Sequence, residues 1–83
     1  MTKVEFDVLL NKASSGDTGS MRAIASLSYK MAEASMDNGD MRGATVFMEI
    51  GNGWQKLSEQ GEGYGNVSEK VKGFTREAFS VCF

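Results

Sequence analysis

The apolar residues of this chain recur at intervals of three and four, and no proline interrupts them anywhere in the 83 residues. This spacing places apolar side chains along one face of an α-helix, whereas a half-buried strand would show strict alternation. Proline breaks helix interiors, so its absence leaves long helices available along the whole chain. The sequence therefore predicts an all-α fold.

The clearest helix boundary is the segment 37–40, which reads Asp-Asn-Gly-Asp. Gly39 is typical of a helix C-terminus, because glycine accepts a positive φ cheaply, and Asp40 is a good N-cap for the next helix. We predict one helix from residue 17 or 18 to residue 37 and a second of similar length after Asp40. Two helices of matched length across a short turn indicate an antiparallel hairpin.

Both helices of this hairpin have apolar faces. The first carries two adjacent stripes: Ile24, Leu27, Met31 and Ala34, and Ala25, Tyr29, Ala32 and Met36. The second carries a narrower seam: Gly43, Phe47, Ile50, Trp54 and Leu57. Gly51 and Gly53 also lie inside it, where each glycine costs about 1 kcal/mol relative to alanine. Either another helix approaches closely at these glycines, which we prefer, or the helix kinks there.

Two shorter helices flank the hairpin. Thr2 and Glu5 form a capping-box pattern before a helix that bears Phe6, Leu9, Leu10 and Ala13 and ends at residues 14–17. Asn66 with Glu69 is expected to cap a fourth helix with an apolar stripe of Val67, Val71, Phe74, Ala78 and Val81. We therefore predict a single helical domain over residues 1–83, with four helices built round a central antiparallel hairpin.

The residues that common enzymes need are absent. With no histidine, the chain has no Ser/His/Asp or Cys/His arrangement and no imidazole ligand for zinc. Cys82 is the only cysteine and has no evident base, so we interpret it as structural. Segment 38–49 has the spacing of a calcium loop but places Arg42 at a ligand position. We expect no catalytic residue, no metal and no cofactor, and hence not an enzyme.

Cysteine usage and charge bear on compartment and partners. A lone cysteine favours a reducing compartment, and no long apolar run is present, so we expect a cytoplasmic protein without a membrane segment. The net charge of −2 argues against direct nucleic-acid binding. Segment 33–69, however, has seven acids against two basic residues. It would suit a basic partner, such as the nucleic-acid groove of another protein; the alternative is an ordinary solvated helical surface.

Two functional interpretations follow. The first is a small acidic interaction protein that occupies a surface on a larger protein or complex, as an inhibitor, adaptor or accessory factor of the kind that phages and mobile elements encode. Exposed methionines form adaptable contacts, although buried ones fill gaps in a core. The candidate partner-binding residues are Glu33, Met36, Asp37, Asp40, Met41 and Trp54. The alternative is a regulatory protein that senses a small molecule or nucleotide, with a pocket near Tyr29, Trp54, Tyr64 and Arg76.

The aromatic content also raises the question of self-association. Eight aromatic residues are many for a thin helical domain, and the last residues include Phe79 and Phe83. Burying them in a symmetric homodimer, through the seam of the third helix or through this C-terminal segment, would add stability. The alternative is that Phe79 and Phe83 fold back onto the first helix and complete a monomeric core.

Overall fold

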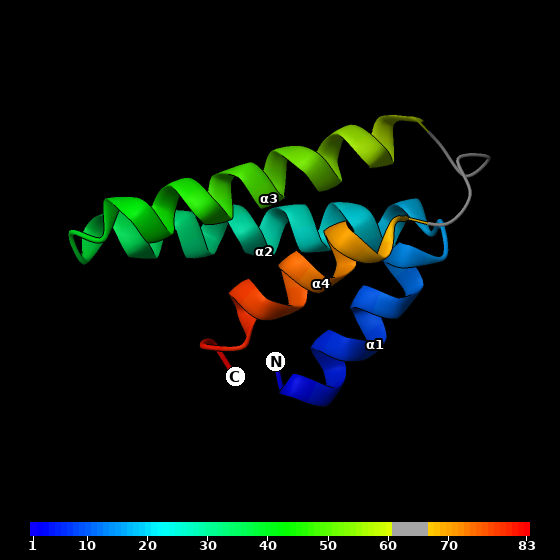
Figure 1. Cartoon of the computed structure of the whole chain (residues 1–83), viewed down its shortest axis with the longest axis horizontal. Coiled ribbons are helices and arrows are strands. Elements are labelled where there is room, and N and C mark those ends of the chain that lie inside the picture. The colour runs from blue at the N-terminus through cyan, green and yellow to red at the C-terminus, as the bar shows by residue number, and fades with distance from the viewer. Residues whose placement is uncertain (61–66) are drawn as a thin grey trace.

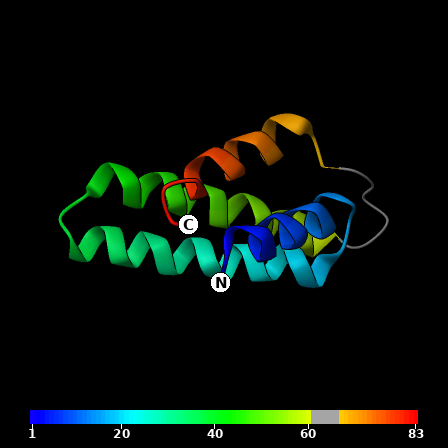
Figure 2. The ribbon, with the colours of Figure 1, turned by 90° about the horizontal axis from the view of Figure 1, so that it is seen from below.

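The computed structural model describes residues 1–60 and 67–83, which form four helices (Figure 1). They are α1 (Lys3–Ser14), α2 (Thr18–Asp37), α3 (Met41–Gln60) and α4 (Glu69–Phe79). Helices α2 and α3 form an antiparallel hairpin that makes one layer of the molecule, and α1 and α4 make the second. Helix α1 packs against α2, α4 contacts both α1 and α3, and both short helices run obliquely to the hairpin (Figure 2). The predicted all-α fold round a central hairpin is confirmed.

The turn between α2 and α3 forms as its residues predict. Gly39 has a φ of 78°, and its N–H donates to the Met36 carbonyl at 3.0 Å. The Asp40 N–H donates to the Ser35 carbonyl at 2.8 Å, which completes a Schellman motif at the end of α2. The Asp40 carboxylate then accepts from the Gly43 N–H at 2.9 Å and caps α3. One aspartate thus ends one helix and begins the next.

The two glycines inside α3 differ in their surroundings. A β-carbon on Gly51 would lie 2.8 Å from Cε1 of Tyr29, whose hydroxyl donates to Asn52 Oδ1 at 2.6 Å. A β-carbon on Gly53 would meet nothing within 4 Å. Helix α3 runs through both positions without a break. Close approach of another helix is therefore the correct explanation for Gly51, while neither explanation applies to Gly53.

Alanine at these two positions should have opposite effects. We expect Gly53→Ala to raise the free energy of unfolding by about 1 kcal/mol through helix propensity alone. Gly51→Ala should lower the free energy of unfolding. The overpacking against the Tyr29 ring costs about 1–3 kcal/mol, which outweighs the gain in helix propensity. Urea denaturation of the two variants measures the difference. Equal stabilisation by both would show that Tyr29 moves aside freely.

Helix α1 begins with the predicted capping box. The Thr2 N–H donates to Glu5 Oε1 at 3.0 Å, and the Glu5 N–H donates to Thr2 Oγ1 at 3.2 Å. The hydrogen bond from the Thr2 backbone lowers the pKa of Glu5. The stabilisation from this box is therefore present above the ordinary carboxyl pKa and is lost as the pH falls through the lowered value.

Helix α4 differs from its prediction at both ends. It begins after Ser68, whose hydroxyl accepts from the Val71 N–H at 3.3 Å, whereas the expected cap residue Asn66 lies outside the described residues. Val67 precedes the helix, is buried, and donates its N–H to the Ser14 carbonyl at 2.9 Å. Val81 lies beyond the end of the helix and is 86% exposed. Neither valine belongs to a helical stripe.

The buried face of α4 was also predicted wrongly. Thr75 and Phe79, one turn apart, are the buried residues of this helix, each 1% exposed. Val71 and Phe74 of the predicted stripe are 38% and 48% exposed. The helix is therefore rotated so that Thr75 and Phe79 face the core, and of the predicted stripe within the helix only Ala78 packs against it.

The C-terminal aromatic residues fold back onto α1. The ring centroids of Phe6 and Phe79 are 4.6 Å apart, and those of Phe6 and Phe83 are 5.3 Å apart. The seam of α3 is likewise inside, because Phe47, Ile50 and Trp54 are buried. The folding back of Phe79 and Phe83 onto α1 is therefore confirmed. A homodimer stays a prediction, and Val81 and Phe83 of the C-terminal segment are 86% and 42% exposed.

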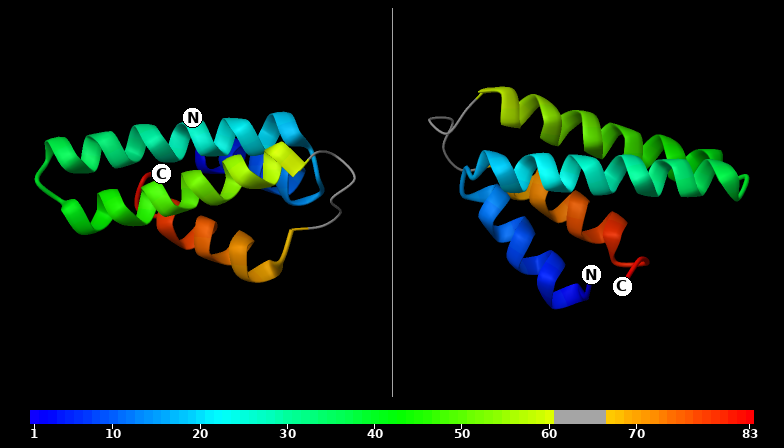
Figure 3. Two further views of the ribbon diagram at one scale, coloured as in Figure 1. Left: turned by 90° about the horizontal axis from the view of Figure 1, so that it is seen from above. Right: turned by 180° about the vertical axis from the view of Figure 1, so that it is seen from behind.

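One end of the hairpin extends beyond the second layer. Helices α2 and α3 have 20 residues each, whereas α1 has 12 and α4 has 11. All views show α1 and α4 packed beside the other half of the hairpin, next to the turn between α1 and α2 (Figure 3). No residue in the segment 33–43 is buried. We refer to this segment as the hairpin end.

Candidate partner-binding surface

Five of the six predicted partner-binding residues lie together at the hairpin end. Three belong to the last turns of α2, one to the turn, and one to the start of α3. All five are exposed, with Met36 at 41% and Met41 at 61%. In chain order they are Glu33, Met36, Asp37, Asp40 and Met41.

Trp54 does not belong to this surface. Its side chain is 1% exposed, and its indole N–H donates to Thr75 Oγ1 at 2.9 Å in the core between α3 and α4. The Thr75 hydroxyl in turn donates to the Val71 carbonyl at 2.8 Å. Trp54 joins two helices and is not free to contact a partner. Its place on the predicted seam of α3 already indicated a core residue.

The charge of the hairpin end is negative, but its carboxylates are not equivalent. The segment contains one cation, Arg42, and three carboxylates, those of Glu33, Asp37 and Asp40. Its net charge is therefore −2. Glu33 and Asp37 lie on the exposed surface of α2. The Asp40 carboxylate caps α3, so removing it would also weaken the helix, typically by about 1 kcal/mol. Glu33 and Asp37 are therefore the carboxylates whose charge can be removed without weakening the cap.

The methionines divide between the two roles that the sequence left open. Met21 is fully buried, and Met31 is half-buried, with its sulfur 3.5 Å from Cys82 Sγ. Met36, Met41 and Met48 are all at least 40% exposed. The first pair fills the core. Met36 and Met41, on either side of the hairpin turn, leave apolar side chains exposed.

The three described residues that were expected to line a ligand pocket do not line one cavity. Tyr29 is hydrogen-bonded to Asn52, and Trp54 lines a hollow of about 150 Å³ between α3 and α4. Arg76 lines a different cavity, between α1 and α4, and Tyr64 lies outside the described residues. Sequence reasoning missed the α1 residues of that second cavity, since they carry no motif.

Two kinds of group in the described chain could take part in chemistry: the Cys82 thiol and side chains that could bind a metal. Burial raises the pKa of the Cys82 thiol, which disfavours the reactive thiolate. Within residues 1–60 and 67–83, no three His, Cys, Asp or Glu side chains are grouped so as to hold a metal ion. The segment with calcium-loop spacing, 38–49, is not a loop, because helix α3 begins at Met41 and includes the rest of the segment.

Comparison of the chain with protein-family models, curated proteins and solved structures finds no match. Among the described helices, none has both the length and the apolarity needed to cross a membrane. The hairpin end therefore has to be interpreted from its own residues.

Proposed function

We propose that this protein is a small, non-catalytic interaction protein that binds a larger protein through the hairpin end and acts as an inhibitor, adaptor or accessory factor. The observation that carries the proposal is the extension of α2 and α3 beyond the core. A lone cysteine favours a reducing compartment, so we place this action in the cytoplasm.

The composition of the hairpin end supports this role. Between residues 33 and 43 no side chain is buried, so the fold itself gains little from the length of these turns. Met36 and Met41 are nevertheless apolar and stand on either side of the turn. Methionine surfaces adapt to a partner by changing rotamers, and they are over-used at interfaces. A partner that covers them would gain apolar burial that the free protein lacks.

The surrounding carboxylates indicate the chemistry of the partner. Glu33 and Asp37 are exposed on the same helix as Met36, and Arg42 is the single cation among residues 33–43. A complementary partner surface is basic at its rim and apolar at its centre. The nucleic-acid groove of another protein has such a basic rim.

Photo-crosslinking in the native host would identify the partner. A benzophenone amino acid at Met41 should capture one large protein, whereas the same group at Glu59, on the exposed C-terminal turn of α3, should not. If both positions capture the same protein, the interface is not confined to the hairpin end and the proposal is wrong.

The purified partner then allows a quantitative test. Glu33→Gln with Asp37→Asn should slow association by about tenfold at low salt and flatten its salt dependence. Met36→Ser with Met41→Ser should accelerate dissociation, again by about tenfold, through lost apolar burial. The matched control is Glu59→Gln with Glu69→Gln, which removes the same charge far from the hairpin end. If this control slows association equally, the effect is one of net charge and the proposed surface is wrong.

A further inference from the structure

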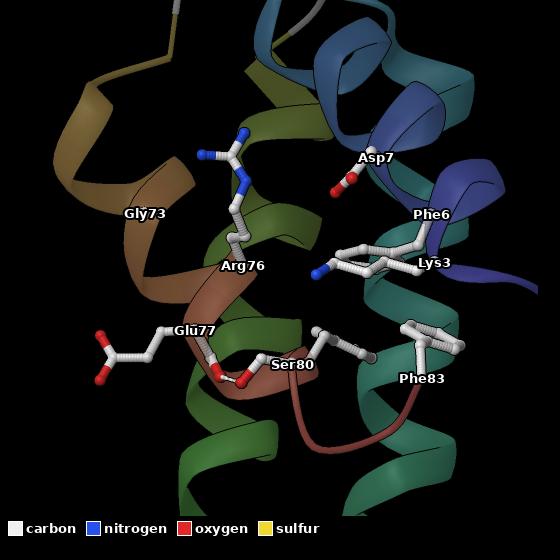
Figure 4. Close-up of a pocket in the computed structure, with 9 residues that line it drawn as sticks. Lys3, Phe6, Asp7, Gly73, Arg76, Glu77, Ser80 and Phe83 are labelled. Carbon is white, nitrogen blue, oxygen red and sulfur yellow. Dashed lines mark hydrogen bonds between the residues drawn. The ribbon is translucent and has the colours of Figure 1, made fainter.

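A second concave surface lies on the other layer of the molecule, between α1, α4 and the residues after α4. It is a cavity of about 400 Å³, and its floor is aromatic (Figure 4). Phe6 and Phe79 are buried beneath it, and Phe83 is 42% exposed at its edge. This volume is within the range of small-molecule sites, which are mostly apolar with few polar groups.

Three charged side chains surround this aromatic floor. Lys3 and Asp7 reach from α1 toward α4, and Arg76 extends along α4 on the opposite side (Figure 4). Among the residues that line the cavity, the one side-chain hydrogen bond joins the Ser80 hydroxyl to the Glu77 carbonyl, which also accepts from the Ser80 N–H. The Glu77 carboxylate points away from the cavity (Figure 4). The inner groups therefore carry one excess positive charge, and none is hydrogen-bonded to another.

The wall formed by α4 contains a glycine without a structural reason. Gly73 is in the middle of α4, lines the cavity, and would meet nothing within 4 Å if it carried a β-carbon. Glycine is a poor helix former, and alanine would be better here. The glycine therefore adds no side chain to this wall of the cavity.

We propose that this cavity binds a small molecule with an aromatic body and one anionic group. The aromatic body would lie on the exposed ring of Phe83, which the buried rings of Phe6 and Phe79 support from beneath, in the offset or edge contacts that aromatic pairs prefer. Lys3 and Arg76 would donate hydrogen bonds to the anion, and such charge-assisted bonds are stronger than neutral ones. Asp7 opposes a second negative charge, which restricts the ligand to a monoanion.

The test uses three probes of one shape: 1-naphthoate, the neutral 1-naphthalenemethanol and the cationic 1-naphthylmethylamine. Titration of the ¹⁵N-labelled full chain should show naphthoate shifting amide signals in residues 3–7 and 73–83, at millimolar concentration or below. Naphthoate should bind about tenfold more tightly than the alcohol, as one favourable charge contact allows, and the amine should bind most weakly.

Variants separate the charge contacts from the apolar contacts. Lys3→Gln with Arg76→Gln should bring naphthoate and the alcohol to similar affinity, and Asp7→Asn should strengthen naphthoate binding. Gly73→Leu should block the cavity and weaken both probes by about tenfold or more. Gly53→Leu, the same change at another open position of a helix, is the control and should bind naphthoate normally.

Three results would overturn the proposal: no shifts confined to these residues, equal affinity for all three probes, or naphthoate binding that survives Gly73→Leu. Melting temperatures of the variants show whether each is folded. A loss of binding counts only in a folded variant, and the control at Gly53 shows whether leucine in a helix is itself harmful.

Discussion

Phe79→Ala should lower the free energy of unfolding by about 3–5 kcal/mol, the usual cost of emptying a buried phenylalanine site. The Phe79 ring is 1% exposed, and its centroid lies 4.6 Å from that of Phe6 and 5.1 Å from that of Phe47. It therefore joins α4 to α1 and to the hairpin at once. Small domains are stable by only about 5–15 kcal/mol, so much of this variant should be unfolded near 37 °C.

Phe74→Ala is the matched control for this prediction. Phe74 is on the same helix but is 48% exposed, so the same substitution should cost less than about 1 kcal/mol. Urea denaturation followed by circular dichroism measures both variants. Equal losses would mean that α4 packs through the apolar stripe that its sequence suggests and not through Phe79.

Trp54→Ala should be similarly costly, at about 3–5 kcal/mol. The indole is the largest fully buried side chain, and it is hydrogen-bonded across the core to Thr75. Thr75→Val keeps the volume but leaves the indole N–H without this acceptor, which should cost about 1–3 kcal/mol. Since Trp54 is the only tryptophan, its fluorescence reports directly on this contact.

The double variant completes this test. With Trp54→Phe, no indole N–H remains, so adding Thr75→Val should then cost much less than in the native background. Stabilities that simply add, with no coupling between the two positions, would show that the hydrogen bond contributes nothing to the fold.

The sequence was sufficient for the central hairpin because its signals are local. Gly39 and Asp40 act through their own backbone and their nearest neighbours, and the spacing of Phe47, Ile50 and Trp54 depends on one helix alone. Five of the six predicted partner-binding residues are exposed together for the same reason, since they surround that turn.

The remaining errors concern contacts between distant segments. The orientation of α4 depends on a threonine that bonds a tryptophan 21 residues earlier, and helical periodicity says nothing about such a pair. The cavity beside Arg76 depends on how α4 meets α1, which stand at opposite ends of the sequence. The sequence predicted that another helix approaches Gly51 closely, but it could not show that Tyr29 is the residue that does so.

The unequal lengths of the two layers have a consequence for motion. Beyond Ala32 and Ala44, both buried, the hairpin end contributes no buried side chain, so its opening exposes little apolar surface. Backbone amides there should exchange with solvent through local fraying, while those near Ile24 and Trp54 should exchange only when the whole domain opens. A partner that binds the hairpin end would have to suppress this fraying. Part of the gross interaction energy is then lost to ordering, and affinity would rise in any variant that stiffens the turn.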